Sequence, residues 1–103
     1  MASYRVFIED EAQQTGKRLP GNIRQRIKRM VDDLAQIPRP LASKALTLEF
    51  DLLSDVEIRR VRLDHWRIVY AVNDHEQWVW ILAIRQRPPY DYSDLTELLN
   101  RID

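Results

Sequence analysis

Apolar residues recur at intervals of one, three or four between residues 20 and 37, a spacing that places them on one face of an α-helix. The stripe consists of Ile23, Ile27, Met30, Val31, Leu34 and Ile37. Pro20 suits the start of this helix because its missing N–H is not needed there, and the sequence PRP at 38–40 ends it. A shorter helix is expected over 10–19, after a strand at 3–8 that is rich in β-branched and aromatic residues.

Beyond residue 45 the pattern changes to alternation of apolar and polar residues, which is typical of half-buried β-strands. The expected strands span residues 46–50, 57–63, 66–73 and 77–86. The turns between the last three are short enough for hairpins. Helical spacing returns after Ser93, a suitable N-cap, at Leu95, Leu98, Leu99 and Ile102.

These elements predict an α+β fold in a single domain over residues 1–103, in the order β-α-α-β-β-β-β-α. A helix pair would pack on one face of a small, twisted, mainly antiparallel sheet, which makes two layers. A chain of 103 residues is long enough to bury one hydrophobic core and too short for two domains.

Composition removes several classes of function. The sequence has no cysteine, which excludes a disulfide framework, thiol catalysis and thiolate metal sites. It has no apolar run of about 18 residues, and its N-terminus lacks the pattern of a secretory signal, so we expect a cytoplasmic protein that does not enter a membrane. His65 and His75 fall in separate turns without convergent carboxylates, so neither a metal site nor a cofactor is expected.

The 16 basic and 16 acidic residues cancel, but they are distributed unevenly. Residues 17–29 contain six basic residues and no acidic one, which suits either a solvated helix face or a docking place for a partner's acidic segment. Residues 59–67 contain four arginines and one acid. Segregated charge of this kind creates a local basic surface on a neutral molecule.

Alternation sorts the strand residues onto two faces of the predicted sheet. The face expected to meet the helices carries Val61, Leu63, Trp66, Ile68, Tyr70, Val72, Trp78, Trp80, Leu82 and Ile84. The opposite face carries Arg60, Arg62, Arg67 and either Arg85 or Arg87. Arg59 falls on the helix side, close enough to the strand end to reach solvent.

Like charges on adjacent strands, ~4.8 Å apart, repel one another, so a sheet that keeps them is expected to use them. Guanidinium groups suit phosphate because they form bidentate hydrogen bonds and stay charged. Exposed strands also carry arginine for solubility or to protect an edge, and this alternative stays open.

Three further residues could transfer a proton beside these arginines. Nearby positive charge lowers the pKa of a tyrosine and makes it a better proton acceptor, which suits Tyr90 or Tyr92. Packing of the last helix against the sheet would explain the same tyrosines. His65 is close in sequence to Arg62 and Arg67, although an exposed turn histidine without function fits equally.

Two stretches of the chain match the ordered elements of a known family. They are LPGNIRQRIKRMVDDLAQIPRP at 19–40 and RRVRLDHWRIVYAVNDHEQWVWILAIRQRPPYDY at 59–92. The first resembles the second helix and proline stop of the RelE/ParE superfamily, toxins of bacterial toxin–antitoxin pairs. The second resembles its hairpin core, with a basic strand, an aromatic-Arg-hydrophobic-hydrophobic-Tyr strand and an apolar strand that ends in basic residues.

The resemblance implies a RelE-like fold and one of two activities. RelE-like members enter the ribosomal A site and cut mRNA without a metal, by attack of the 2′-hydroxyl that leaves a 2′,3′-cyclic phosphate. ParE-like members share the fold and inhibit DNA gyrase without catalysis. We favour the RelE-like branch, since the predicted arginine face matches its residue set. Fold alone does not separate the two branches.

Carried over to this sequence, the RelE-like set assigns a role to each basic residue. Arg60 and Arg62 would hold the RNA backbone, Arg67 would contact the scissile phosphate, and Arg87 (or Arg85) would stabilise the transition state. Tyr92 (or Tyr90) would act as the base or stack on a nucleobase. RelE has lysines where Arg60 and Arg62 stand, and arginine does not give up a proton. Proton transfer would therefore fall on a tyrosine or on His65.

The resemblance also implies partners. They are a cognate antitoxin, the ribosome with its mRNA, and operator DNA only indirectly through the antitoxin. A second alternative to the nuclease, beside gyrase inhibition, is an inactive relic that still binds its antitoxin.

Overall fold

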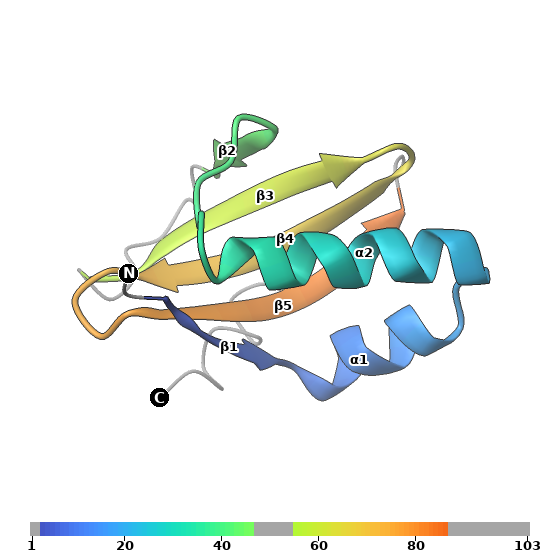
Figure 1. The fold of residues 1–103 in the computed structure, drawn as a ribbon, viewed down its shortest axis with the longest axis horizontal. Coiled ribbons are helices and arrows are strands. Elements are labelled where there is room, and N and C mark those ends of the chain that lie inside the picture. Colours follow the sequence, from blue (N-terminus) through green and yellow to red (C-terminus); the bar gives the residue numbers. More distant parts are fainter. Residues whose placement is uncertain (1–2, 47–54, 87–103) are drawn as a thin grey trace.

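The computed structural model describes residues 3–46 and 55–86. Their elements are β1 (Arg5–Ile8), α1 (Asp10–Lys17), α2 (Gly21–Leu34), β2 (Ser43–Ala45), β3 (Glu57–Leu63), β4 (Trp66–Asn73) and β5 (Trp78–Gln86). Two helices pack on one five-stranded sheet, which confirms the two-layer α+β prediction (Figure 1). The helix expected after Ser93 lies outside the described residues.

The sheet has the order β1-β5-β4-β3-β2. Its hairpins β3–β4 and β4–β5 are antiparallel, as is the β2–β3 pair. β1 pairs in parallel with β5, with Arg5 opposite Trp78, so the sheet is mixed. Parallel neighbours need a long crossover, and the chain from α1 to β4 supplies it.

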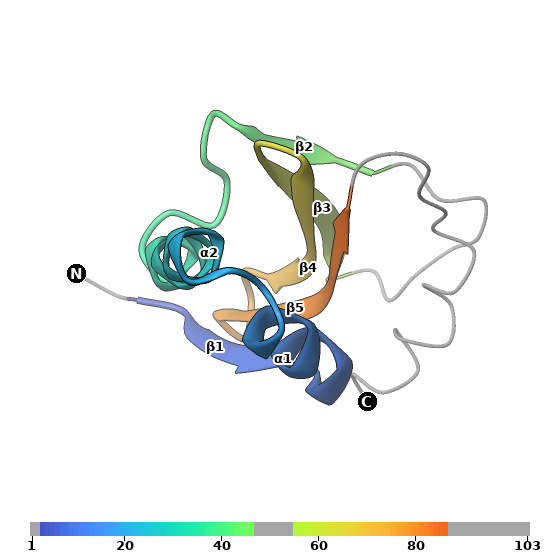
Figure 2. The ribbon, with the colours of Figure 1, turned by 90° about the vertical axis from the view of Figure 1, so that its right-hand side faces the viewer.

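The main core lies between α2 and the sheet. Figure 2 shows both helices on one side of the strands, and Figure 1 shows α2 crossing in front of β4 and β5. This cluster includes Ala12, Leu19, Ile27, Val31, Leu34, Val61, Ile68, Tyr70, Val72, Val79, Ile81 and Ile84. Each fully buried aliphatic side chain stabilises the fold by about 1.5–3 kcal/mol, so this stripe explains why α2 forms.

α2 is shorter than its apolar stripe. It ends at Leu34, and Ile37 is 61% exposed, so the expectation that Ile37 joins the core was wrong. The N–H of Tyr4 donates to the carbonyl of Ala35 at 2.8 Å, which ties the start of β1 to the end of the helix. Neither α1 nor α2, the helices of the described residues, is long and apolar enough to cross a membrane.

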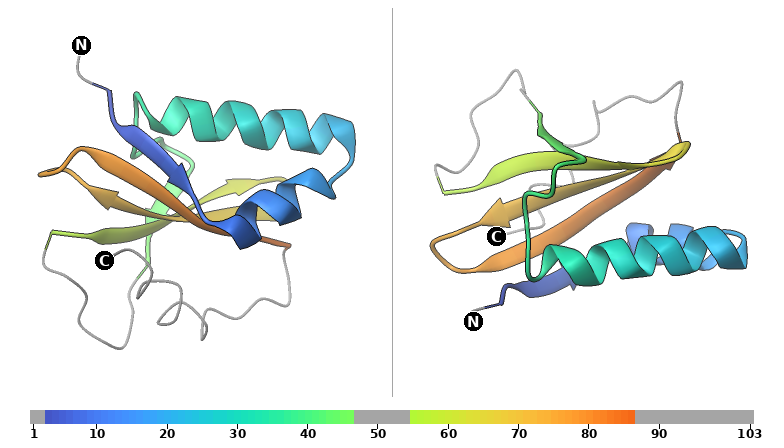
Figure 3. Two further views of the ribbon diagram at one scale, coloured as in Figure 1. Left: turned by 90° about the horizontal axis from the view of Figure 1, so that it is seen from below. Right: turned by 45° about the horizontal axis from the view of Figure 1, so that its top comes forward.

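The strand expected at 46–50 begins earlier than its alternation suggests. β2 spans Ser43–Ala45, and Lys44 lies opposite Arg60 of β3. Leu46 follows the strand, while Leu48 and Phe50 lie outside the described residues. In Figure 3, right, the short green β2 lies above the yellow-green β3, with which it pairs.

A β-bulge in β5 reverses one prediction. Val69 pairs with Ala83 and Tyr70 pairs with Ile81, so Leu82 is an extra residue and the alternation shifts by one position. Trp78, Trp80 and Leu82 therefore lie on the face away from the helices, whereas Val79 and Ile81 face them. Trp66, Tyr70 and Ile84 were assigned correctly.

The face away from the helices holds a second apolar cluster as well as the arginines. It contains Ile58, Val69, Ala71, Leu82 and Ala83, with Leu46, Val56, Trp78 and Trp80 packed against it. The Trp80 Nε1–H donates to Glu9 Oε1 at 3.0 Å, and its ring centroid lies 5.1 Å from that of Phe7. The arginine face is therefore basic at only one end.

Candidate functional site

Three arginines form a row across the three central strands, close to the turn between β3 and β4. Arg67 of β4 lies directly opposite Arg62 of β3 on one side and Arg85 of β5 on the other. Side chains paired in this way stand about 4.5–5.5 Å apart at Cβ, and like charges there destabilise a sheet. The prediction that alternation brings Arg62, Arg67 and Arg85 together is confirmed.

A second cationic pair extends the row toward the edge of the sheet. Arg60 lies opposite Lys44 of β2, two residues along β3 from Arg62 and on the same face. Sequence reasoning missed Lys44, although extending the alternation of Leu46, Leu48 and Phe50 backwards by two residues reaches it. We call Lys44, Arg60, Arg62, Arg67 and Arg85 the basic face.

Members of the basic face differ in exposure. Lys44 and Arg62 are exposed, Arg60 is half-buried, and Arg67 is 5% exposed. Arg85 leans toward α1, with its Nη2 3.8 Å from Glu11 Oε1. The buried guanidinium of Arg67 thus lies at the centre, between two arginines that reach solvent.

His65 lies at the tip of the β3–β4 hairpin, next to the basic face. It is exposed, as expected for a turn residue. The preceding Asp64 has φ of 53°, a left-handed conformation that aspartate tolerates, and it forms an ion pair with Arg26 of α2. Arg87, Tyr90 and Tyr92, the other expected site residues, lie outside the described residues and remain predictions.

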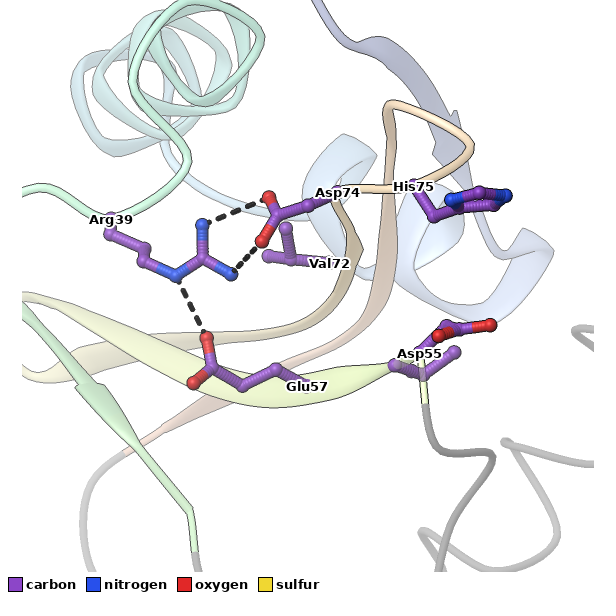
Figure 4. A pocket seen from close by; sticks show the side chains of 7 residues that line it. Arg39, Asp55, Glu57, Val72, Asp74 and His75 are labelled. Atoms are coloured by element: carbon purple, nitrogen blue, oxygen red, sulfur yellow. Dashed lines mark hydrogen bonds and ion pairs between the residues drawn. The ribbon is translucent and has the colours of Figure 1, made fainter.

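A different charged group lies at the opposite end of β4, in a pocket of ≈ 510 Å³ (Figure 4). Arg39, from the link between α2 and β2, donates from Nη1 and Nη2 to the two carboxylate oxygens of Asp74 at 3.0 and 2.8 Å. Its Nε donates to Glu57 Oε1 at 3.0 Å. The Tyr4 hydroxyl donates to Asp74 Oδ1 at 2.6 Å. We call Tyr4, Arg39, Glu57 and Asp74 the clasp.

The clasp shifts the ionisation of its own members. Hydrogen bonds from Arg39 first and Tyr4 second lower the pKa of Asp74. The hydrogen bond to Asp74 raises the pKa of Tyr4, and the same carboxylate raises the pKa of Arg39. Each shift favours the charge state that the contacts require, so the clasp is a satisfied structural network.

Arg59 belongs with the clasp and not with the basic face. Its side chain is 14% exposed, so it reaches solvent only in small part. It donates to Ser43 Oγ at 2.8 Å and to Glu57 Oε1 at 3.2 Å. The nearby Tyr70 hydroxyl donates to the carbonyl of Pro38 at 2.7 Å, and burial raises the Tyr70 pKa.

The basic face can bind negatively charged groups, because it gathers permanently charged side chains. Five cations on one face suit a polyanion such as a nucleic-acid backbone. Within residues 3–46 and 55–86, no three His, Asp or Glu side chains gather as a metal site would require.

Comparison with known proteins places this two-layer fold in a class and then in a family. The class is that of small toxins from toxin–antitoxin systems. A family model described as "ParE toxin of type II toxin-antitoxin system, parDE" matches residues 6–88, and the chain belongs to this family. It is a type II toxin–antitoxin toxin of the RelE/ParE superfamily. Among curated protein sequences no significant match was found.

Solved structures of similar fold come from both archaea and bacteria. A chain of the archaeal RelE–RelB complex from Pyrococcus horikoshii is 26% identical with a TM-score of 0.74, over 87% of this chain and 100% of that chain. A chain of the RelBE2 complex from Mycobacterium tuberculosis is 24% identical with a TM-score of 0.66, over 82% and 99%. Isolated RelE from E. coli is 20% identical with a TM-score of 0.61, over 97% and 99%.

Proposed function

We propose that this toxin is a ribosome-dependent mRNA endoribonuclease that inhibits translation. The observation that carries the proposal is the in-register row of Arg62, Arg67 and Arg85 on three adjacent strands. Like charges this close together repel one another in the free protein, and a phosphate bound over the row would relieve that repulsion.

The proposed chemistry requires no metal. The 2′-oxygen of the RNA bonds to the neighbouring phosphorus as its proton passes to a base, and the 5′-oxygen leaves with a proton, which yields a 2′,3′-cyclic phosphate. Extra negative charge develops on the phosphate oxygens, and preorganised guanidinium donors stabilise it. Because arginine keeps its protons, Tyr92 (or Tyr90) or His65 would serve as the acid or base.

Roles within the basic face follow from position. Arg60 and Arg62 would hold the RNA backbone, since both reach solvent on β3. Arg67 would contact the scissile phosphate at the centre of the row, and Arg85 or Arg87 would stabilise the transition state. The cognate antitoxin would wrap the toxin and mask this face, and operator DNA would be contacted only through the antitoxin. The toxin would act in the cytoplasm.

A gyrase inhibitor without catalysis is the second candidate. Two observations favour it. The matching family model is named for ParE, and Arg67 is 5% exposed. A guanidinium that buried must be uncovered before it touches RNA, whereas a binding protein could use it for structure alone.

Primer extension on a reporter mRNA, after brief expression of the toxin alone, separates the candidates. The matched pair is Arg60→Ala/Arg62→Ala on the basic face and Arg24→Ala/Arg29→Ala on the exposed side of α2. We expect cuts within translated codons from the unmodified and α2 proteins, none from the basic-face variant, and none when translation is blocked. Growth arrest with intact mRNA would reject the nuclease and favour gyrase, and normal growth would indicate an inactive relic.

A further inference from the structure

A second pocket lies at the β2 end of the basic face. It lies where the edge strand β2 meets β3, has a volume of ≈ 460 Å³, and is lined by Leu41, Ala42, Ser43, Lys44, Arg60 and Arg62. It shares Arg62 with the arginine row, so the pocket adjoins the place where the scissile phosphate would bind.

One wall of the pocket is cationic. Lys44 and Arg60 face each other across the two strands, and Arg62 follows two residues later. In the described part of the chain neither Lys44 nor Arg60 forms an ion pair. Adjacent cations without a carboxylate between them favour an anionic ligand.

The other wall carries an apolar side chain on a hydrogen-bonded turn. Leu41 is fully exposed, at 106% of its reference area. It sits in a turn that the Ser43 N–H closes by donating to the carbonyl of Pro40 at 2.9 Å, and the Ser43 hydroxyl donates to the same carbonyl at 2.7 Å. Arg59 in turn donates to that hydroxyl. The turn therefore presents Leu41 to solvent as an apolar surface.

We propose that this pocket binds the nucleotide next to the scissile phosphate in single-stranded RNA. This inference rests on the proposed function. Lys44 and Arg60 would hold the flanking phosphate, while Leu41 would cover the face of its base. A purely acidic peptide would satisfy the cations but has no apolar group to cover Leu41, so RNA fits both walls better. Because Leu41 offers apolar contact without hydrogen bonds, the pocket would influence cleavage sites through contact with the face of the base and not through base-edge recognition.

Binding can be measured apart from cleavage with a labelled RNA hexanucleotide that carries 2′-O-methyl groups, which block attack by the 2′-oxygen. Lys44→Gln should weaken binding about 3- to 10-fold and reduce the slope of log Kd against log salt by about 0.7, the value for one phosphate contact on a single strand. Lys28→Gln, the same change on the exposed side of α2, should alter neither.

Leu41 is tested by changing its size in both directions. Leu41→Ala should weaken binding and leave the salt slope unchanged, because no charge is lost. Leu41→Phe should tighten binding about 2- to 5-fold, since aromatic rings stack on bases more strongly. In a translating extract, the two variants should also redistribute cuts among codons.

The outcomes separate this pocket from the nuclease itself. If Lys44→Gln behaves like Lys28→Gln, or if both Leu41 variants bind like the unmodified protein, the pocket proposal is wrong even where mRNA is cut. If the expected binding pattern appears without ribosomal cleavage, RNA binding in the pocket is supported and the proposed nuclease activity is rejected. If a poly-glutamate peptide binds with this Lys44 dependence and the hexanucleotide does not bind, the RNA assignment is overturned in favour of an acidic peptide.

Discussion

The charged groups at the two ends of β4 are arranged differently. At one end Arg67 stands between Arg62 and Arg85, three like charges in register. At the other end Arg39 is enclosed by Asp74 and Glu57, with Tyr4 completing the network. The clasp pairs opposite charges within the chain, whereas the basic face brings like charges together, an arrangement that an anionic ligand would stabilise. The difference separates an arginine enclosed by carboxylates from arginines that we propose bind RNA.

The largest effect should come from the basic face. Arg62→Ala should lower ribosome-dependent cleavage roughly 10- to 100-fold, because it removes a charge-assisted hydrogen bond to the RNA backbone worth about 1.5–3 kcal/mol. The free energy of unfolding should change by less than about 0.5 kcal/mol, because the side chain is exposed. Cleavage kinetics beside urea denaturation would check both values. Loss of stability without loss of cleavage would show that this row serves the fold.

The clasp should give the reverse result. Asp74→Asn removes the charge that Arg39 and Tyr4 contact, and we expect it to lower the free energy of unfolding by about 1–2 kcal/mol, since the pair is bidentate but partly exposed. Cleavage by the folded protein should stay within about twofold of the unmodified rate, as expected for a change remote from the site. A tenfold loss of cleavage at unchanged stability would place the clasp in the binding machinery.

The clasp should no longer contribute to the free energy of unfolding at low pH. The folded-state pKa of Asp74 lies below its ordinary value of 3.8, so its stabilisation is complete above the unfolded pKa and disappears as pH falls through the folded pKa. The stability difference between the unmodified protein and Asp74→Asn should therefore be constant near neutral pH and shrink below about pH 4. Denaturation curves at several pH values would test this, and a difference that grows in acid would contradict it.

The smallest effect should come from the single ion pair of Arg26 with Asp64. Both side chains are about half exposed, at 48% and 52%, so Arg26→Ala should cost only about 0.2–1 kcal/mol. Thermal unfolding at low and high salt would show the contribution vanish as salt screens it. A larger or salt-independent loss would mean that the hairpin tip depends on this contact as strongly as the other end of β4 depends on the clasp.

Local pattern was enough to predict the basic face on β3 and β4, because both strands alternate without interruption and a hairpin fixes their register. It failed for Trp78 and Trp80, since the extra residue Leu82 shifts the alternation and neither glycine nor proline marks the bulge. The clasp left no local signal at all. Tyr4 and Asp74 are 70 residues apart in the sequence, and Arg39 and Asp74 are 35 apart, so only the folded chain brings them together.

The parallel pairing of β1 with β5 has a consequence for how the protein is made. Arg5 pairs with Trp78, so β1 cannot take its place in the sheet until β5 has been synthesised. At about 5–20 residues per second, synthesis takes several seconds to cover that interval, during which Phe7 and Ile8 have no neighbouring strand. β5 also supplies Arg85 to the row. The sheet and the proposed RNA surface are therefore completed by the same late event, and a growing chain lacks the finished surface until β5 has joined.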